Sequence, residues 1–193
     1  RRAAGSRSRR SPVGDERSPG QPRLTLRTNR PYDASALMNP DPLPRRTVAV
    51  VLAAGLGTRM KSRTPKVLHP LCGRPMLAYV LDAARAAPGE RPLVVYSPPT
   101  AAIRDVFAEE ADFALQDEPR GTGDALRAAL AVLPADVAEI VLAYADVPLL
   151  EASLLEELLA EHRASDAALS LVSVITMDPA NLGRVVRDDD GNV

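Results

Sequence analysis

The feature that most constrains the fold of this chain is a regular alternation of short apolar runs and amphipathic segments after residue 46. Thr47–Ala53 (TVAVVLA) is apolar and rich in β-branched residues, which is typical of a strand buried on both faces. Pro75–Ala87 has apolar residues at helical spacing and proline in its first turn, which predicts a helix. We expect further strands at Leu93–Tyr96, Phe113–Leu115, Glu139–Tyr144 and Ala167–Ile175, and further helices at Ala101–Glu110, Gly123–Leu133 and Ser153–Arg163.

Strands that alternate with helices of about ten residues form βαβ units, whose strands run parallel. We therefore predict an α/β fold: a Rossmann-like, mostly parallel sheet with helices on both faces. The 193 residues suit one domain, which we place at residues 47–193. The chain ends at Asp188–Val193 (DDDGNV), which is typical of a hairpin turn after an outgoing strand at Val185–Arg187. A domain that stops inside a hairpin is expected to be truncated.

Residues 1–46 differ from the rest in composition. They contain 11 arginines against four acidic residues, many Pro, Ser and Gly, and no apolar periodicity, so we expect a disordered extension. Its charge leaves an arm for nucleic acid or another anionic surface as an alternative, and a transit peptide as a weaker one. Translated upstream sequence without a fold, with Met38 as the biological start, is the interpretation we favour, so no nucleic-acid partner is expected.

The charge balance of residues 47–193 limits the kind of site they can form. They carry a net charge of −8, so a phosphate site there must be local and not a broad basic face. Cys72 is the only cysteine, which excludes an intrachain disulfide and predicts a small buried side chain. No apolar run approaches the roughly 20 residues of a membrane span, and the N-terminus lacks the apolar core of a secretory signal. A cytoplasmic protein without membrane contact is the expectation.

A glycine-rich loop follows the first predicted strand. In open α/β sheets, ligands bind beyond the carboxyl ends of the strands, and Ala54–Thr58 occupies that position. Small residues let the backbone approach a nucleotide, and successive amides form a concavity for anions. The loop is not a Walker A motif, because no Gly-Lys-Ser/Thr closes it. It is not the dinucleotide GxGxxG either, because Met60 replaces the third glycine.

Two cations beside this loop favour a phosphate site. Arg59 lies at its end, and Lys66 follows Pro65, which restricts the approach of the chain. An arginine can bind two phosphate oxygens in parallel, and a lysine provides a compact charge. We predict phosphate contact for both, and a solvated position for Arg63.

The segments Leu52–Met60, Pro65–His69 and Gly73–Met76 together resemble the signature of nucleotidyltransferases. The resemblance is strongest to the uridyltransferase domain of enzymes that also carry a glucosamine-1-phosphate acetyltransferase, and it covers residues 47–193. It implies that Leu52, Ala53, Ala54 and Gly55 contact the nucleotide, with Arg59 and Lys66 as catalytic cations. A homotrimer is implied only if a C-terminal β-helix domain is present in the full-length protein.

Two later segments carry the same resemblance. In Gln116–Ala125 (QDEPRGTGDA) a glutamine amide suits the edge of a uracil ring, and a glycine turn opens the next predicted helix. The resemblance places Gln116 and Gly121 at the base and Thr122 at the nucleotide-sugar.

Asp146 follows the strand Glu139–Tyr144, at the edge of the sheet where the loop lies. Mg²⁺ prefers hard oxygen donors and usually takes only one or two carboxylates, so we predict Asp146 as a Mg²⁺ ligand. By resemblance Tyr144 and Ala145 contact the sugar nucleotide, with Ala145 replacing the usual glycine. Gly183 matches a glycine that contacts the sugar, and further site residues of the family lie beyond Val193.

The resemblance implies nucleotidyl transfer from UTP to N-acetylglucosamine-1-phosphate, which gives UDP-N-acetylglucosamine and pyrophosphate for cell-wall precursor synthesis. Two alternatives stay open. A cytidylyl- or guanylyltransferase keeps the fold and changes the substrates, and an inactive fragment binds nucleotide without turnover.

Overall fold

Four parallel strands form the central sheet of this protein. The structure is a computed structural model, and it describes residues 23–25, 45–57, 60–118, 120–165, 167–178, 180 and 182–188. Their order across the sheet is β6-β5-β2-β7. The bounds are Thr47–Leu52 for β2, Leu93–Tyr96 for β5, Asp112–Leu115 for β6 and Glu139–Tyr144 for β7. All four run in one direction, so their carboxyl ends share one edge. The predicted parallel α/β sheet is confirmed.

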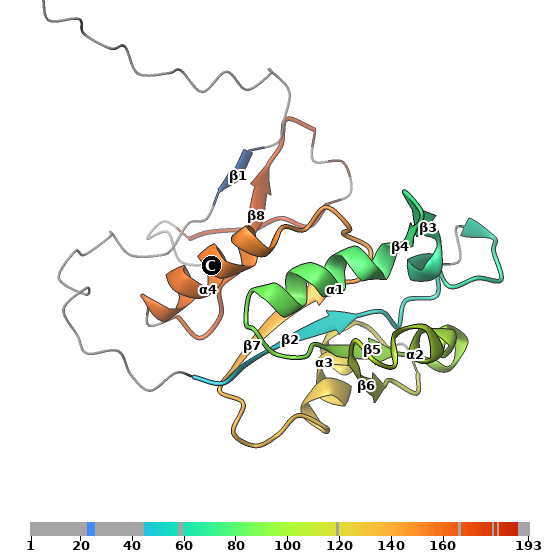
Figure 1. Ribbon diagram of the computed structural model, residues 1–193. Coiled ribbons are helices and arrows are strands. Elements are labelled where there is room, and N and C mark those ends of the chain that lie inside the picture. The colour runs from blue at the N-terminus through green and yellow to red at the C-terminus, as the bar shows by residue number, and fades with distance from the viewer. Residues whose placement is uncertain are drawn as a thin grey trace, which may run out of the picture. The chain divides into compact units, whose positions relative to one another are not determined.

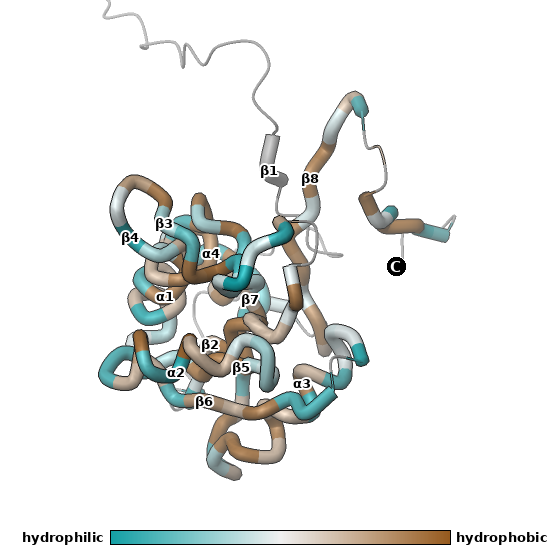
Figure 2. The backbone as a smooth tube through the Cα atoms, turned by 90° about the vertical axis from the view of Figure 1, so that its right-hand side faces the viewer, coloured by the Kyte–Doolittle hydropathy of each residue, from teal (hydrophilic) through white to brown (hydrophobic). Residues whose placement is uncertain are grey.

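Helices cover both faces of this sheet, as predicted (Figure 1). Helices α1 (Met76–Ala86) and α4 (Ala152–Arg163) pack against each other on one face, and α3 (Thr122–Leu130) packs on the other. The short helix α2 (Ala102–Phe107) joins the α1 side, where its buried side chains share a cluster with those of α1. Figure 2 shows hydrophobic residues along β2, as expected for a central strand covered on both sides.

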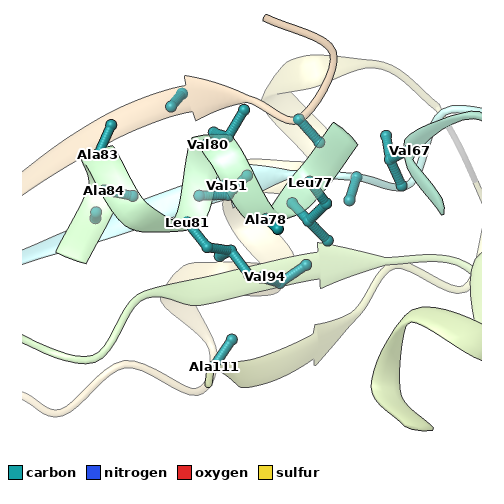
Figure 3. Packing of buried hydrophobic residues seen from close by; sticks show 14 of the residues in the cluster. Val51, Val67, Leu77, Ala78, Val80, Leu81, Ala83, Ala84, Val94 and Ala111 are labelled. Atoms are coloured by element: carbon teal, nitrogen blue, oxygen red, sulfur yellow. The ribbon is translucent and has the colours of Figure 1, made fainter. Parts of the chain in front are cut away.

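The alternation of side chains along β2 supplies both halves of the core. Val48 and Val50 face the α3 cluster, whereas Ala49 and Val51 face the α1 cluster. Leu77 and Leu81 of α1 are fully buried, and Figure 3 shows Leu81 reaching toward Val94 of β5. Each such leucine or valine contributes about 1.5–3 kcal/mol by leaving water.

Between β2 and α1 the chain forms a short 3₁₀ helix, η3 (Lys66–Leu68), and a hairpin of β3 (Pro70–Leu71) and β4 (Arg74–Pro75). The hairpin was not predicted. Its two turn residues, Cys72 and Gly73, have φ of 49° and 84°, as a tight type I′ turn requires. The prediction that Cys72 is buried is wrong, because the turn presents its thiol to solvent.

A buried charge network ties the first residues of β2 and β7 together at the amino edge of the sheet. The Glu139 carboxylate is 4% exposed and accepts hydrogen bonds from Thr47 Oγ1 at 2.8 Å and from Arg163 Nε at 2.9 Å. Arg45 Nη1 lies 3.6 Å from its other oxygen. Burial alone raises the pKa of Glu139, but the bonds from Arg163 and Thr47 and the arginine charges outweigh it, so the pKa is below its ordinary value.

A second, smaller unit comprises the ends of the chain and is described by itself. In it β1 (Arg23–Thr25) pairs antiparallel with β8 (Ser173–Ile175). The strand β1 departs from the expectation of no regular structure in residues 1–46, because pairing with a distant segment overrides local composition. The strand predicted from Ala167 begins only at Ser173.

The predicted strand at Val185–Arg187 is wrong, because these residues have no regular secondary structure. Most of the predicted hairpin turn after it, residues 189–193, lies outside the described residues. No helix among the described residues is long and apolar enough to cross a membrane.

Candidate active site

A cavity of about 610 Å³ lies at the carboxyl edge of the sheet, a volume typical of small-molecule sites. Its walls come from the segments that follow β2, β6 and β7, from η3 and from the start of α3. These segments are far apart in sequence and meet because the parallel strands end at one edge. The lining residues are Leu52, Ala53, Ala54, Gly55, Leu56, Gly57, Met60, Lys66, Val67, Gln116, Gly121, Thr122, Ala125, Tyr144, Ala145 and Asp146.

The glycine-rich turn after β2 is anchored to both neighbouring strands. The Ala53 amide donates to the Val95 carbonyl at 2.8 Å, and the Ala145 amide donates to the Leu52 carbonyl at 3.0 Å. These bonds extend the parallel ladder past the end of β2. The turn therefore leaves the sheet in a fixed direction, and its residues 54–57 line the cavity.

A buried serine holds the next residue of the turn. Ser97 is fully buried and donates its hydroxyl to the Ala54 carbonyl at 2.9 Å. Ser97 is itself held by Thr100, whose hydroxyl accepts from the Ser97 amide at 2.9 Å. Sequence reasoning missed Ser97, because a serine before two prolines carries no signal of such a contact.

Gly57 lets the chain pass against Lys66. It has a φ of +57°, and a Cβ at this position would lie 2.8 Å from the Lys66 Cβ. Any side chain at 57 must therefore displace Lys66. Val67, which follows Lys66, is buried in the α1 cluster. The backbone of Lys66 is therefore held by Gly57 on one side and by Val67 on the other.

Lys66 and Asp146 form an ion pair at the rim of the cavity. Lys66 Nζ donates to Asp146 Oδ2 at 2.8 Å, although the two residues are 80 apart in sequence. Their side chains are 35% and 47% exposed. An ion pair this exposed contributes only about 0–1 kcal/mol, because water competes for both charges. Both groups can therefore exchange partners at little cost.

Gln116 follows β6 and is buried, with 3% of its surface exposed. The backbone N–H of Gln116 donates a hydrogen bond to the Tyr96 carbonyl at 2.8 Å, and this bond continues the ladder between β5 and β6. The side-chain Nε2 donates to Asp124 Oδ2 at 2.9 Å and to the Gly121 carbonyl at 3.3 Å. The side chain is thus fixed against the first turn of α3.

The N-terminus of α3 borders the cavity beside Gln116. Gly121 caps the helix with a φ of 110° and no side-chain bond, and Thr122 is its first residue. Both line the cavity. The first amides of a helix lack partners within it and carry partial positive charge, which suits an oxygen or phosphate ligand.

Tyr144 and Ala145 form the wall next to Asp146. Tyr144 is 50% exposed, whereas Ala145 is 1% exposed and belongs to the apolar cluster under α1. A methyl group at position 145 is accommodated by the core. The end of β7 stays in register with β2, because the Ala145 amide donates to the Leu52 carbonyl.

The structure brings together eleven of the predicted site residues around this one cavity: Leu52, Ala53, Ala54, Gly55, Lys66, Gln116, Gly121, Thr122, Tyr144, Ala145 and Asp146. Their individual roles stay predictions. Arg59 lies outside the described residues. Gly183 belongs to the second unit, whose position relative to the cavity is not defined.

Five further lining residues were not named individually as ligand contacts, although the loop Ala54–Thr58, which contains two of them, was predicted to bind phosphate: Leu56, Gly57, Met60, Val67 and Ala125. All five lie inside the segments that drew attention in the sequence. The sequence therefore located the segments, and the structure shows which further positions within them line the cavity.

The donor set at the cavity suits one divalent cation held mainly by its ligand. Asp146 offers a half-exposed carboxylate to the cavity, and the described residues contain no cluster of three or more His, Cys, Asp or Glu residues able to hold a metal. Mg²⁺ fits such a site, because it often takes one carboxylate and completes its shell with phosphate and water. Lys66 engages only Oδ2 of this carboxylate, which leaves Oδ1 as a second oxygen for a cation.

The fold and the cavity define a nucleotide-handling α/β domain, and comparison with known proteins identifies its family. The family model described as "MobA-like NTP transferase domain" matches residues 49–179. The chain belongs to this family, whose activity class is nucleotidyl transfer.

Among curated proteins the chain is similar to bifunctional proteins named GlmU. It is 44% identical over 158 residues to that of Mycolicibacterium paratuberculosis, which covers 78% of this chain and 32% of the relative. It is 46% identical over 145 residues to that of Pseudomonas aeruginosa, which covers 75% and 31%. The chain thus spans about a third of the length of the curated relatives it matches.

Among solved structures the chain resembles Rv0371c from Mycobacterium tuberculosis, with a TM-score of 0.52 and 31% identity over 60% of this chain and 59% of that one. A manganese complex of the same protein matches with a TM-score of 0.50 and 28% identity, and covers 60% and 58%. These likenesses agree with the α/β nucleotidyltransferase fold.

Proposed function

We propose that this chain is the nucleotide-binding part of an enzyme that transfers the uridylyl group of UTP to N-acetylglucosamine-1-phosphate. The observation that carries the proposal is the meeting of three separate motifs at one cavity, with Lys66 Nζ 2.8 Å from Asp146 Oδ2. Identity of 41–46% to proteins named GlmU supports it, although the chain spans only a third of them.

The proposed reaction joins two anions. A phosphate oxygen of the sugar phosphate attacks the α-phosphorus of UTP, a new phosphorus–oxygen bond forms, and the bond to the β-phosphate oxygen breaks as pyrophosphate leaves. Alignment and charge stabilisation dominate such phosphoryl chemistry, and no covalent nucleophile is needed. Amides of the turn Ala54–Gly57 and the N-terminus of α3 supply the neutral donors of the site.

Lys66 is proposed to stabilise the negative charge of the phosphates as pyrophosphate develops, with Arg59 as a second cation. Stabilising this charge requires a donor that is already held in place before the reaction. Lys66 meets this requirement, because Gly57 and the buried Val67 hold its backbone.

Asp146 is proposed to hold a divalent cation, which we take to be Mg²⁺. When bound, such an ion screens the two substrate phosphates from each other. A manganese complex of the related Rv0371c supports the use of a divalent metal by this fold. The exposed ion pair with Lys66 leaves the carboxylate open to exchange.

The test is pyrophosphate release by the intact gene product with a panel of UTP, CTP, GTP and dTTP and with N-acetylglucosamine-1-phosphate. Activity confined to UTP is expected. Preference for CTP or GTP would replace the proposal by the cytidylyl- or guanylyltransferase alternative. UTP binding to this chain without pyrophosphate release identifies the 193 residues as an inactive fragment of such an enzyme.

A further inference from the structure

The orientation of the Gln116 side-chain amide is determined by its two neighbours. Nε2 faces Asp124 Oδ2 at 2.9 Å and the Gly121 carbonyl oxygen at 3.3 Å. A carboxylate and a carbonyl can only accept hydrogen bonds, whereas an amide presents a donor on one side and an acceptor on the other. A flipped amide would place Oε1 against two acceptors, so only one orientation is compatible with this environment.

The same orientation turns Oε1 away from α3. Oε1 accepts no hydrogen bond from the described residues, and it is not among their fully buried unpartnered atoms. Gln116 lines the cavity. The side chain therefore offers the cavity a fixed acceptor, which favours a ligand with an N–H at that place and disfavours one with a bare lone pair.

We propose that Asp124 is a positioning residue that sets the base specificity of the site. By holding Gln116 Nε2, it keeps Oε1 toward the nucleobase and selects a base whose ring nitrogen 3 carries a hydrogen, as in uracil and thymine. Nitrogen 3 of cytosine carries no hydrogen, so its lone pair would face Gln116 Oε1, and two acceptors cannot form a hydrogen bond. This inference rests on the proposed function and on the prediction, made from the resemblance, that Gln116 contacts the base.

Asp124 is better placed for this task than the Gly121 carbonyl. Its bond is the shorter of the two and is charge-assisted, which makes it the stronger. Asp124 also lies in the first turn of α3, where the helix dipole stabilises a carboxylate. The Gly121 carbonyl is engaged further by the Ala125 amide at 3.1 Å.

The experiment measures the dissociation constants of UTP and CTP for this chain by calorimetry. The wild type should prefer UTP. In Asp124→Ala the Gln116 amide keeps only its longer contact with the Gly121 carbonyl, so it can turn more easily and the ratio of the two constants should fall about tenfold, in line with the cost of one misplaced buried hydrogen bond. Asp124→Asn should keep most of the preference, because its side-chain oxygen can still accept from Gln116.

Controls separate this effect from a general loss of structure. Asp124→Ser removes the contact but keeps a residue that suits the start of a helix, so it should lose the preference with unchanged circular dichroism. Asp105→Ala removes a comparable first-turn carboxylate from α2 and should leave the ratio unchanged. A merely structural role predicts that both nucleotides weaken by the same factor.

The outcomes are distinguishable. A wild type that binds neither nucleotide overturns both the proposed function and this inference. A wild type that prefers UTP, together with Asp124→Ala and Asp124→Ser variants that keep the same ratio, overturns the role of Asp124 alone.

Discussion

The two ends of the β2–β7 pair carry two ion pairs of opposite character. At the amino edge, where Thr47 pairs with Glu139, the carboxylate is 4% exposed and held by several donors. At the carboxyl edge, Asp146 lies two residues beyond Tyr144, the last residue of β7 that pairs with β2. Its side chain is 47% exposed, and among the described residues it holds Lys66 alone. The buried pair at the amino edge is fixed, whereas the exposed pair at the carboxyl edge can exchange its partners.

The difference teaches how burial divides structural from functional charge. A buried carboxylate whose partners are removed becomes an uncompensated charge, which costs stability. A half-exposed pair contributes little to folding, because water replaces either partner. We therefore expect substitutions at the carboxyl edge to change chemistry and those at the amino edge to change stability.

The largest expected effect is on catalysis. Lys66→Ala should lower the rate of pyrophosphate release by the intact gene product by on the order of 10²–10³, as for loss of one preorganised donor. The free energy of unfolding should change by less than about 1 kcal/mol. The matched control is Lys61→Ala, which removes the only other lysine, exposed and five residues away. Near-normal turnover in Lys66→Ala would break the functional half of the comparison.

The second effect is on stability at the opposite edge. Arg163→Ala removes the main charged partner of the buried Glu139 and should cost about 3 kcal/mol in urea unfolding, because the carboxylate keeps only the Thr47 hydroxyl and the more distant Arg45. Nucleotide affinity should be unchanged. Arg74→Ala, which breaks an exposed pair with Asp82, is the control and should cost much less stability than Arg163→Ala, because water competes for both charges. Equal losses in the two variants would show that burial does not separate these pairs.

A third prediction tests how the Lys66 backbone is held. Gly57→Ala introduces a methyl group 2.8 Å from the Lys66 Cβ at a φ that side chains rarely adopt, so it should destabilise the fold by about 1–2 kcal/mol. The displacement of Lys66 should also weaken UTP binding. Gly55→Ala is the steric control, because a Cβ there meets no atom within 4 Å, and its stability should stay within about 0.5 kcal/mol of wild type. Unchanged UTP affinity in Gly57→Ala would argue against the phosphate role of Lys66.

The sheet and the cavity were predictable for different reasons. Runs such as Glu139–Tyr144 are buried between two helix layers, so local pattern and tertiary position agree. The motif segments follow strands, and parallel strands gather whatever follows them at one edge. The meeting of Lys66 with Asp146 therefore follows from topology.

What the sequence did not reveal depends on contacts between distant segments. Nothing local marks Arg23–Thr25 as a strand, because the strand with which it pairs in the described part of the chain, β8, lies about 150 residues later. The bonds of Ser97 to Ala54 and of Asp124 to Gln116 likewise require side-chain directions that spacing does not encode. The resemblance predicts which residues contact the ligand, and the structure shows the groups that hold Ala54 and Gln116 in place.

The smallest expected effect is the pH dependence of the amino-edge pair. Because the folded-state pKa of Glu139 is below its ordinary value of 4.5, the unfolded chain binds more protons there in mild acid. The stabilisation is therefore complete above about pH 4.5 to 5 and is lost as the pH falls through the folded-state pKa. Urea unfolding from pH 7 to pH 3 should show a steeper acid loss in wild type than in Glu139→Gln, which cannot titrate at this position. Parallel curves would mean that Glu139 is bound no more tightly than a surface carboxylate, and the contrast between the two edges would then rest on exposure alone.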